Sequence, residues 1–423
     1  MNLSDNLIEY LIKNSGNERA EFIELIRYNL GNTIYGHGDH FSKNKRWLVR
    51  CDNRLKDYVE FLLIKLFREV KSNDSKAVLS SAYSKWNTHI RTMGYDVSNP
   101  AWNLRRDVNI LASLKLYVLT KQIIRDFNRK NFNYLVGIKF QIKIDKYIRL
   151  FREHCEDTNY SALFVPNDIG FFEKVAIKVF KELKKPSFFL AHGGMPLRYD
   201  GIMGNRTDYS LQWGKLQVDA FVKMGYKRSK LLAVGHPIYN EVPAALRNSH
   251  DDVLVLTKSI TKVSPVNEVA LEDIGNAIMY LVSIQNVLMK TGVRSARLRP
   301  HPSESFSWYS RFIDNDFFIE DSEELSNSLG RSTLVIGPTS TTIIDSLVYG
   351  VNYVVYEPIV NNLTLMRLPV TPPLDGSDDR IPIANNELEL KRLVENRICI
   401  DLSVLGSLLL IPRNLSFLED LIQ

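Results

Sequence analysis

The sequence contains few cysteines, and none of the spacings that usually carry metal or redox chemistry. Cys51, Cys155 and Cys399 are three isolated residues in a chain of 423, and no two form a CxxC pair. This usage favours reduced thiols and argues against a cysteine-based metal site. The chain also has neither a G-x-G-x-x-G sequence nor a Walker P-loop. Dinucleotide and ATP chemistry therefore lose support.

Long apolar runs are missing as well. The opening stretch MNLSDNLIEYLIKN lacks the basic region and the apolar segment of a secretory signal. No run approaches the roughly 18 apolar residues of a membrane-spanning helix. We therefore expect a cytoplasmic protein. A hydrophobic fraction of 45% and a charged fraction of 24% are typical of a globular chain, and 423 residues predict two domains.

Metal ligands are scarce. His37 and His40 in the segment GHGDH have a spacing that metal sites use, but glycine, histidine and aspartate together are more typical of a polar loop. No DxD-like acidic pair follows an expected strand convincingly. We expect no metal site and no cofactor.

The net charge of +6 is densest between Lys121 and Arg152, where basic residues alternate with aromatic ones. One interpretation is a solvated helix face with its aromatic residues in the core. The other is an attachment surface for anionic lipid headgroups or an anionic acceptor, which would place the protein on the inner membrane. Nucleic-acid binding is not expected, because no helix-turn-helix, RNP or zinc-finger pattern accompanies the charge.

Apolar runs that predict strands alternate with helical patterns from about residue 160 onward, which indicates parallel α/β sheets. A polar stretch at 241–250 resembles a linker, and a second alternating run follows it. We expect two Rossmann-like domains facing each other across a cleft. The first spans residues 1–245, including a helical N-terminal extension, and the second spans 246–405. Residues 406–423 are expected to form a helix that crosses back to the first domain.

Phosphate-directed motifs cluster in the second half. The run RLRPHPSES ends an expected strand, and Arg299, His301 and Pro302 lie at its end. An imidazole and helix N–H groups there would bind a phosphate. The run STLVIGPTSTTIIDSLVYGVNYVVY has four hydroxyl residues after its glycine, where helix capping needs only one. They are Thr339, Ser340, Thr341 and Thr342. Glu357, after the next strand, either binds a ribose hydroxyl or occupies an ordinary strand-end turn.

Acid/base candidates lie in the first half. His192 ends an expected strand and precedes two glycines, which let a ligand approach the backbone. A histidine is a natural general base for an acceptor hydroxyl. Asp168, also at a strand end, is the competing base or a carboxylate nucleophile. His236 precedes a proline just before the linker, which suggests a position at the hinge or in the cleft.

Several of these motifs resemble a known group. FFLAHGG, the segments TDY and QWG, MGY and KLLAVGHPIYN together resemble bacterial surface-polysaccharide glycosyltransferases of the GT-B architecture. RPHP with a downstream Ser/Thr cluster is similar to motifs of bacterial sialyltransferases and Kdo transferases, and CDP-glycerol glycerophosphotransferases share a related pattern. The resemblance covers about residues 160–358. It implies that His301 and Thr339 to Thr342 bind the phosphate of CMP, and that the N-terminal domain receives the acceptor.

We therefore hypothesise a metal-independent glycosyltransferase that moves a 2-keto acid sugar, Kdo or a sialic-acid relative, from a CMP donor. The acceptor would be a glycan or glycolipid of lipopolysaccharide or capsule synthesis. The acidic pair of the sialyltransferases has no clear match, since Asn167 and Asp168 only approximate it. The identity of the catalytic base therefore stays open, and so does the question whether the transfer inverts or retains the configuration of the sugar. The alternatives are a CDP-glycerol or NDP-sugar transferase of the same fold and a non-catalytic scaffold for polysaccharide assembly.

Overall fold

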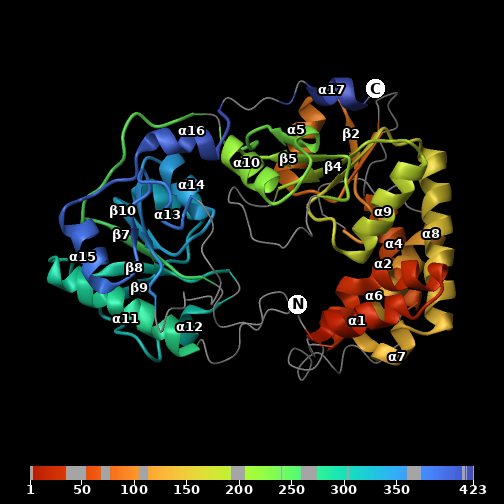
Figure 1. Ribbon diagram of the computed structural model, residues 1–423, viewed down its shortest axis with the longest axis horizontal. Coiled ribbons are helices and arrows are strands. Elements are labelled where there is room, and N and C mark those ends of the chain that lie inside the picture. Colours follow the sequence, from red (N-terminus) through yellow and green to blue (C-terminus); the bar gives the residue numbers. More distant parts are fainter. Residues whose placement is uncertain are drawn as a thin grey trace.

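The structure is a computed structural model of the chain. It describes residues 3–34, 54–67, 77–103, 113–191, 205–239, 241–258, 274–302, 304–359, 373–411, 415 and 417–422. Figure 1 shows these residues gathered in two α/β groups, one built mainly from the first half of the chain and one from the second.

The first sheet has six parallel strands in the order β2-β1-β3-β4-β5-β6. They are β1 (Ala77–Ser80), β2 (Asp96–Ser98), β3 (Ala162–Val165), β4 (Ser187–Leu190), β5 (Tyr209–Gln212) and β6 (Leu231–Ala233). Successive side chains enter opposite faces: Leu163 and Val165 join one core cluster, while Ala162 and Phe164 join another. Because both faces are covered, β3 is apolar along its whole length.

Helices cover both faces of this sheet. One face packs on α2 (Asn17–Ile34), α6 (Leu114–Arg129), α8 (Ile138–Thr158) and α9 (Phe171–Glu182). The other packs on α5 (Ser84–Thr92) and α17 (Phe417–Ile422), which lie together at the top of Figure 1. The remaining elements are α1 (Leu3–Lys13), α4 (Arg54–Phe67), α7 (Phe132–Leu135), α10 (Lys215–Lys223) and the 3-10 turn η1 (Arg228–Lys230).

The second sheet also has six parallel strands, in the order β12-β11-β10-β7-β8-β9. They are β7 (Val253–Leu256), β8 (Ala296–Arg299), β9 (Phe318–Glu320), β10 (Leu334–Gly337), β11 (Asn352–Tyr356) and β12 (Ile383–Ala384). Its helices are α11 (Ile274–Lys290), α12 (Phe306–Tyr309), α13 (Leu325–Arg331), α14 (Thr342–Val348), α15 (Glu387–Glu395), the 3-10 turn η3 (Leu402–Val404) and α16 (Leu405–Leu408). Two six-stranded parallel sheets with flanking helices confirm the predicted α/β fold of two Rossmann-like domains.

Some local features differ in detail from the expectations. The helical N-terminal extension begins with two helices, because the polar residues Asn14 and Ser15 and then Gly16 separate α1 from α2. The stretch 241–250, expected to be a linker, lies between β6 and β7 and also packs on the second domain, where the Arg247 guanidinium donates to the carbonyl oxygens of Gly330 and Tyr349. Within residues 406–423, which were expected to form one helix, the described part holds the end of α16 and, separately, α17.

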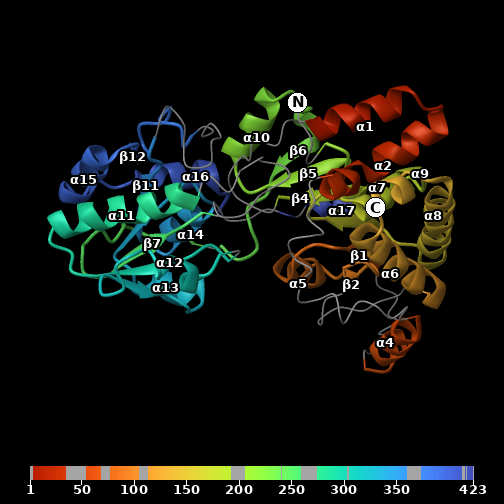
Figure 2. The same cartoon turned by 90° about the horizontal axis from the view of Figure 1, so that it is seen from below.

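The two domains meet where α10 and α16 lie next to each other, as both views show (Figures 1 and 2). The Leu410 amide donates to the Trp213 carbonyl oxygen over 2.8 Å. A Cβ atom on Gly214 would lie 2.4 Å from the Leu408 carbonyl, so only glycine permits this approach. After α16 the chain returns to the first domain, where Leu418 and Ile422 are buried.

The basic segment forms α6, α7 and α8. Four of its cations pair with carboxylates: Lys121 with Glu60, Arg125 with Asp57, Lys143 with Asp126, and Arg152 with Glu182. Its aromatic residues Phe140 and Tyr147 are fully buried, as the first interpretation of this segment expects. Attachment to anionic lipid or to an anionic acceptor stays a prediction. Among the described helices, none is both long and apolar enough to cross a membrane.

Candidate functional site

The candidate site lies at the carboxyl edge of the second sheet. From β7 the chain proceeds to β8 and β9 on one side, whereas β10 and β11 lie on the other. The strand order therefore reverses between β7 and β10. Ligands of open α/β sheets bind beyond the carboxyl ends of the strands at such a reversal. Here the strand ends place Thr257 and Lys258 after β7, Thr339 after β10 and Glu357 after β11.

A tyrosine on β11 shapes the turn that follows β10. The Tyr353 hydroxyl donates to the Pro338 carbonyl oxygen over 2.6 Å. It passes so close to Gly337 that a Cβ atom there would lie 2.2 Å from the hydroxyl oxygen. Gly337 is thus required by close approach, and the resulting turn brings the Thr339 amide to Glu357.

Glu357 is the central group of the site. Its side chain is about 1% exposed, and its Oε1 accepts hydrogen bonds from the Thr339 amide (2.6 Å) and from Lys258 Nζ (3.2 Å). Its Oε2 is buried and has no hydrogen-bond partner within the described part of the chain, and the same holds for Thr339 Oγ1. Leaving such an oxygen unpaired costs about 1–3 kcal/mol, more for a charged group. Among the described residues, the site therefore lacks a hydrogen-bond donor for Glu357 Oε2.

His301 lies on the adjacent strand end, where its backbone is fixed. The His301 amide donates to Thr257 Oγ1 (2.9 Å), and that hydroxyl donates to Glu304 Oε2 (2.6 Å). The Tyr309 hydroxyl donates to the same carboxylate oxygen (2.8 Å). His301 and Pro302 are exposed. The loop thus holds a histidine at the surface of the edge by bonds to its backbone.

Three residues of the hydroxyl cluster precede α14, and the fourth, Thr342, is its first residue. Thr341 is the residue before the helix, and no side-chain oxygen caps the helix from that position. Ser340 Oγ accepts from the Thr342 amide (3.3 Å) and lies 3.1 Å from Thr342 Oγ1. These hydroxyls follow Thr339 in the chain, and the Thr339 amide is bonded to Glu357.

Arg299 is placed differently from the other predicted phosphate ligands. Its guanidinium donates to Asp321 Oδ1 (3.0 Å) and to the Glu323 carbonyl oxygen (2.5 Å). Arg297 also pairs with the buried Asp321. Arg299 thus holds β8 to the segment after β9, and a role in binding phosphate would compete with that pairing.

In the first domain, Asp168 is fully buried, and its Oδ2 accepts from the amides of Asn205 (3.0 Å) and Arg206 (2.9 Å). This places it in a loop-fixing position. His192, like His37 and His40, lies outside the described residues. His236 lies among aromatic rings, 4.2 Å from Trp213 and 5.6 Å from Trp86 between ring centroids. Burial, with a smaller effect of Lys85, lowers the pKa of His236 to about 3, so its imidazole is neutral near pH 7.

Thr257 and Lys258 were not predicted from the sequence. The signal was present, since the run DVLVL is followed directly by a hydroxyl and an amine. Both residues follow a strand end, and Glu357 was selected from the sequence because it does the same.

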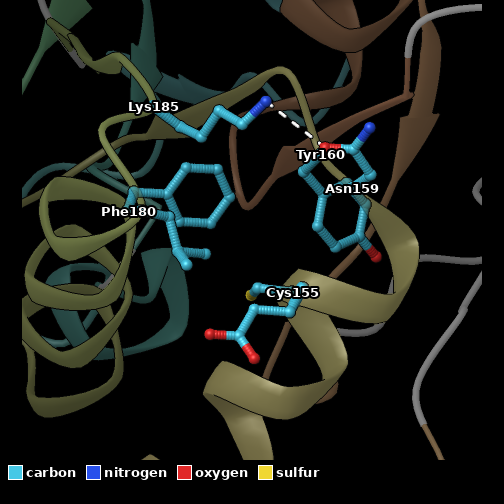
Figure 3. A pocket seen from close by; sticks show the side chains of 7 residues that line it. Cys155, Asn159, Tyr160, Phe180 and Lys185 are labelled. Carbon is cyan, nitrogen blue, oxygen red and sulfur yellow. Dashed lines mark hydrogen bonds between the residues drawn. The ribbon is translucent and has the colours of Figure 1, made fainter.

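Two other features lie apart from this edge. A cavity of about 200 Å³ is lined by Cys155, Glu156, Asn159, Tyr160, Phe180, Leu183 and Lys185, shown in Figure 3. Its residues precede β3 and β4, so it lies at the amino edge of the first sheet, and none of the predicted site residues lines it. Within the described ranges, no three His, Cys, Asp or Glu side chains are grouped closely enough to hold a metal ion.

No protein-family model matches the chain, and no curated protein matches its sequence. Several solved structures resemble the chain over most of its length. A putative UDP-N-acetylglucosamine 2-epimerase from Listeria monocytogenes is 12% identical, with a TM-score of 0.46 over 82% of this chain and 94% of that one. The UDP-GlcNAc 2-epimerase from Neisseria meningitidis, bound to UDP-GlcNAc, is 11% identical, with a TM-score of 0.45 over 82% and 98%. A variant of the wall teichoic acid polymerase TagF is 11% identical, with a TM-score of 0.38 over 88% and 97%.

Proposed function

We propose that this protein is a glycosyltransferase that binds a nucleotide-activated sugar at the carboxyl edge of its second sheet. The observation that supports this most directly is the buried Oε2 of Glu357, which has no hydrogen-bond donor among the described residues. A ribose hydroxyl is a neutral donor of the right kind. It would pair with the carboxylate without bringing a second negative charge.

Cationic and hydroxyl groups beside Glu357 suit the phosphate of the same ligand. Lys258 is 29% exposed and sits 3.2 Å from Glu357 Oε1, so its ammonium can also face a phosphate oxygen. His301 on the next strand and the hydroxyls of Ser340 and Thr342 supply further donors. A protonated imidazole and an ammonium would stabilise the negative charge that develops on the departing phosphate. We propose that no metal ion is required for this step.

The donor we propose is a CMP-activated 2-keto acid sugar, Kdo or a sialic-acid relative, and the acceptor a hydroxyl of a glycan or glycolipid. This choice of donor rests on the resemblance of the His-Pro motif at His301 and of the Ser/Thr cluster to motifs of bacterial sialyltransferases and Kdo transferases. His192 is the proposed general base that removes the acceptor proton, with Asp168 as its competitor. The burial of Asp168 and its two backbone bonds favour His192.

Isothermal titration of CMP, CDP, UMP and UDP into the protein tests the donor site. We expect CMP to bind, and Glu357→Gln to weaken it roughly tenfold, since a hydroxyl bonded to a charged acceptor loses about 1.4 kcal/mol when the acceptor becomes neutral. Glu395→Gln, an exposed glutamate on α15, is the matched control and should leave affinity unchanged. Tighter binding of CDP or UDP would favour the CDP-glycerol or NDP-sugar alternative. Absence of any nucleotide binding would favour the scaffold.

Release of CMP from CMP-Kdo and CMP-sialic acid, with a deacylated glycolipid as acceptor, tests the reaction. His301→Ala should abolish release while its thermal unfolding stays like that of the wild type. Normal release by that variant would remove His301 from the proposed mechanism.

A further inference from the structure

A hydrogen bond between side chains joins the first domain to the helix that follows the hydroxyl cluster. The Tyr239 hydroxyl, after β6, donates to Asp345 Oδ1 in the first turn of α14 over 2.5 Å. The two residues are 106 positions apart in the sequence. Tyr239 is 4% exposed, and burial raises the pKa of the Asp345 carboxyl. The bond therefore lies where water competes little for either partner.

On the first-domain side, this contact continues to the end of β4. The Tyr239 ring packs on Trp213, with ring centroids 5.8 Å apart. The Trp213 indole N–H donates to the Ala191 carbonyl oxygen over 3.0 Å, and Ala191 directly precedes His192 in the chain.

On the second-domain side, Asp345 stands three positions after Thr342 in the same helix. An α-helix repeats every 3.6 residues, so Asp345 is one turn from the hydroxyl cluster. A movement of Asp345 would therefore also move Thr342, which lies in the same helix. Ser340 would move with them, because its hydroxyl is bonded to the Thr342 amide.

We propose that Tyr239 and Asp345 are positioning residues. Their bond fixes α14, and with it the proposed phosphate-binding hydroxyls, against the ends of β4, β5 and β6 in the first domain. This inference rests on the proposed function for its catalytic part, because it sets the distance between donor and acceptor groups without touching either. Misplacement by about 1 Å is enough to slow a bimolecular transfer strongly.

Two measurements on Tyr239→Phe test the proposal. Hydrogen exchange of the α14 amides should become about tenfold faster, with exchange in β7 and β10 unchanged, because one bond to a charged acceptor is lost. In CMP release, kcat should fall roughly tenfold while the dissociation constant of CMP stays within about twofold, since the nucleotide contacts lie wholly in the second domain.

Conservative and matched variants separate positioning from packing. Asp345→Asn keeps an oxygen that accepts from Tyr239, so kcat should remain within about threefold of the wild type, whereas Asp345→Leu should behave like Tyr239→Phe. The double variant Tyr239→Phe/Asp345→Leu should be no slower than either single one, which is the signature of a shared bond. Tyr349→Phe, an exposed tyrosine just after α14, should change neither exchange nor kcat.

The outcomes distinguish this inference from the function on which it rests. An unchanged kcat and unchanged exchange in Tyr239→Phe would overturn the inference and leave the proposed transferase intact. A wild-type protein that binds no nucleotide would refute the proposed function. Faster exchange of α14 in Tyr239→Phe would then still support the interdomain bond, and unchanged exchange would overturn it.

Discussion

Lys174 is a lysine whose charged side chain is buried. It lies on α9, with its side chain 7% exposed, and its ammonium donates to the Glu24 carbonyl oxygen over 2.7 Å. The Glu24 carboxylate is 3.4 Å away and is shared with Arg27 and Arg206. Burial, which Glu24 only partly offsets, lowers the pKa of Lys174 to about 8. The protonated lysine is therefore less favourable in the folded chain than in the unfolded one.

This pKa gives a stability prediction with a definite sign. Between the folded pKa of about 8 and the unfolded value of 10.5, the unfolded chain binds more protons at Lys174, so the free energy of unfolding should rise with pH. At about 1.4 kcal/mol for each pH unit, the gain reaches about 3 kcal/mol. In Lys174→Met this contribution disappears. Urea unfolding of both proteins at several values between pH 7 and pH 10.5 measures the difference, and two parallel curves would contradict the assignment.

The turn between β10 and α14 depends on Gly337, because there is no room there for a Cβ atom. Gly337→Ala places a Cβ atom 2.2 Å from the Tyr353 hydroxyl oxygen and 2.9 Å from Cζ, so the ring must move and its bond to Pro338 is lost. Overpacking of this kind costs about 1–3 kcal/mol, and the lost bond adds to it. We expect a lower melting temperature and weaker CMP binding, because Thr339 leaves Glu357. Calorimetric melting and titration measure both.

Gly330→Ala is the matched control for that turn. Gly330 lies in α13, and a Cβ atom there would have no neighbour within 4 Å. Alanine favours a helix over glycine by about 1 kcal/mol, so this variant should be as stable as the wild type or slightly more so. Equal losses from both substitutions would show that the space around Gly337 is not what matters.

The elements that the sequence predicted are those with a strong local pattern. The fully buried strands β3, β4 and β10 were predicted from their largely apolar runs, and Glu357 from its place after such a strand. β2 and β12 were not, because three and two residues are too short to show a period and are fixed by pairing with β1 and β11. The bond of Tyr239 to Asp345 and the pairing of Arg299 with Asp321 depend on tertiary contacts that no local pattern records.

At the scale of the whole molecule, the last helix completes the domain that begins the chain. Leu418 and Ile422 of α17 are 1% and 5% exposed, and Leu415 before the helix is 6% exposed. They join the cluster that contains Trp86 of α5 and Phe164 of β3. The first domain is therefore closed by residues that the chain reaches only after passing through the second domain. The core of the first domain therefore includes residues that lie beyond the second domain in the sequence.

Leu418→Ala tests whether the first domain needs these residues. Truncating a buried leucine costs about 2–5 kcal/mol through lost burial and the cavity left behind, and here the loss should fall on the first domain. Hydrogen exchange of β3 and β4 amides should accelerate, while β10 and β11 stay protected. Leu388→Ala on α15, where the side chain is 77% exposed, is the control and should change neither. If β3 kept its protection in Leu418→Ala, α17 would be a passive tail, and the first domain would hold its own core without the C-terminal residues.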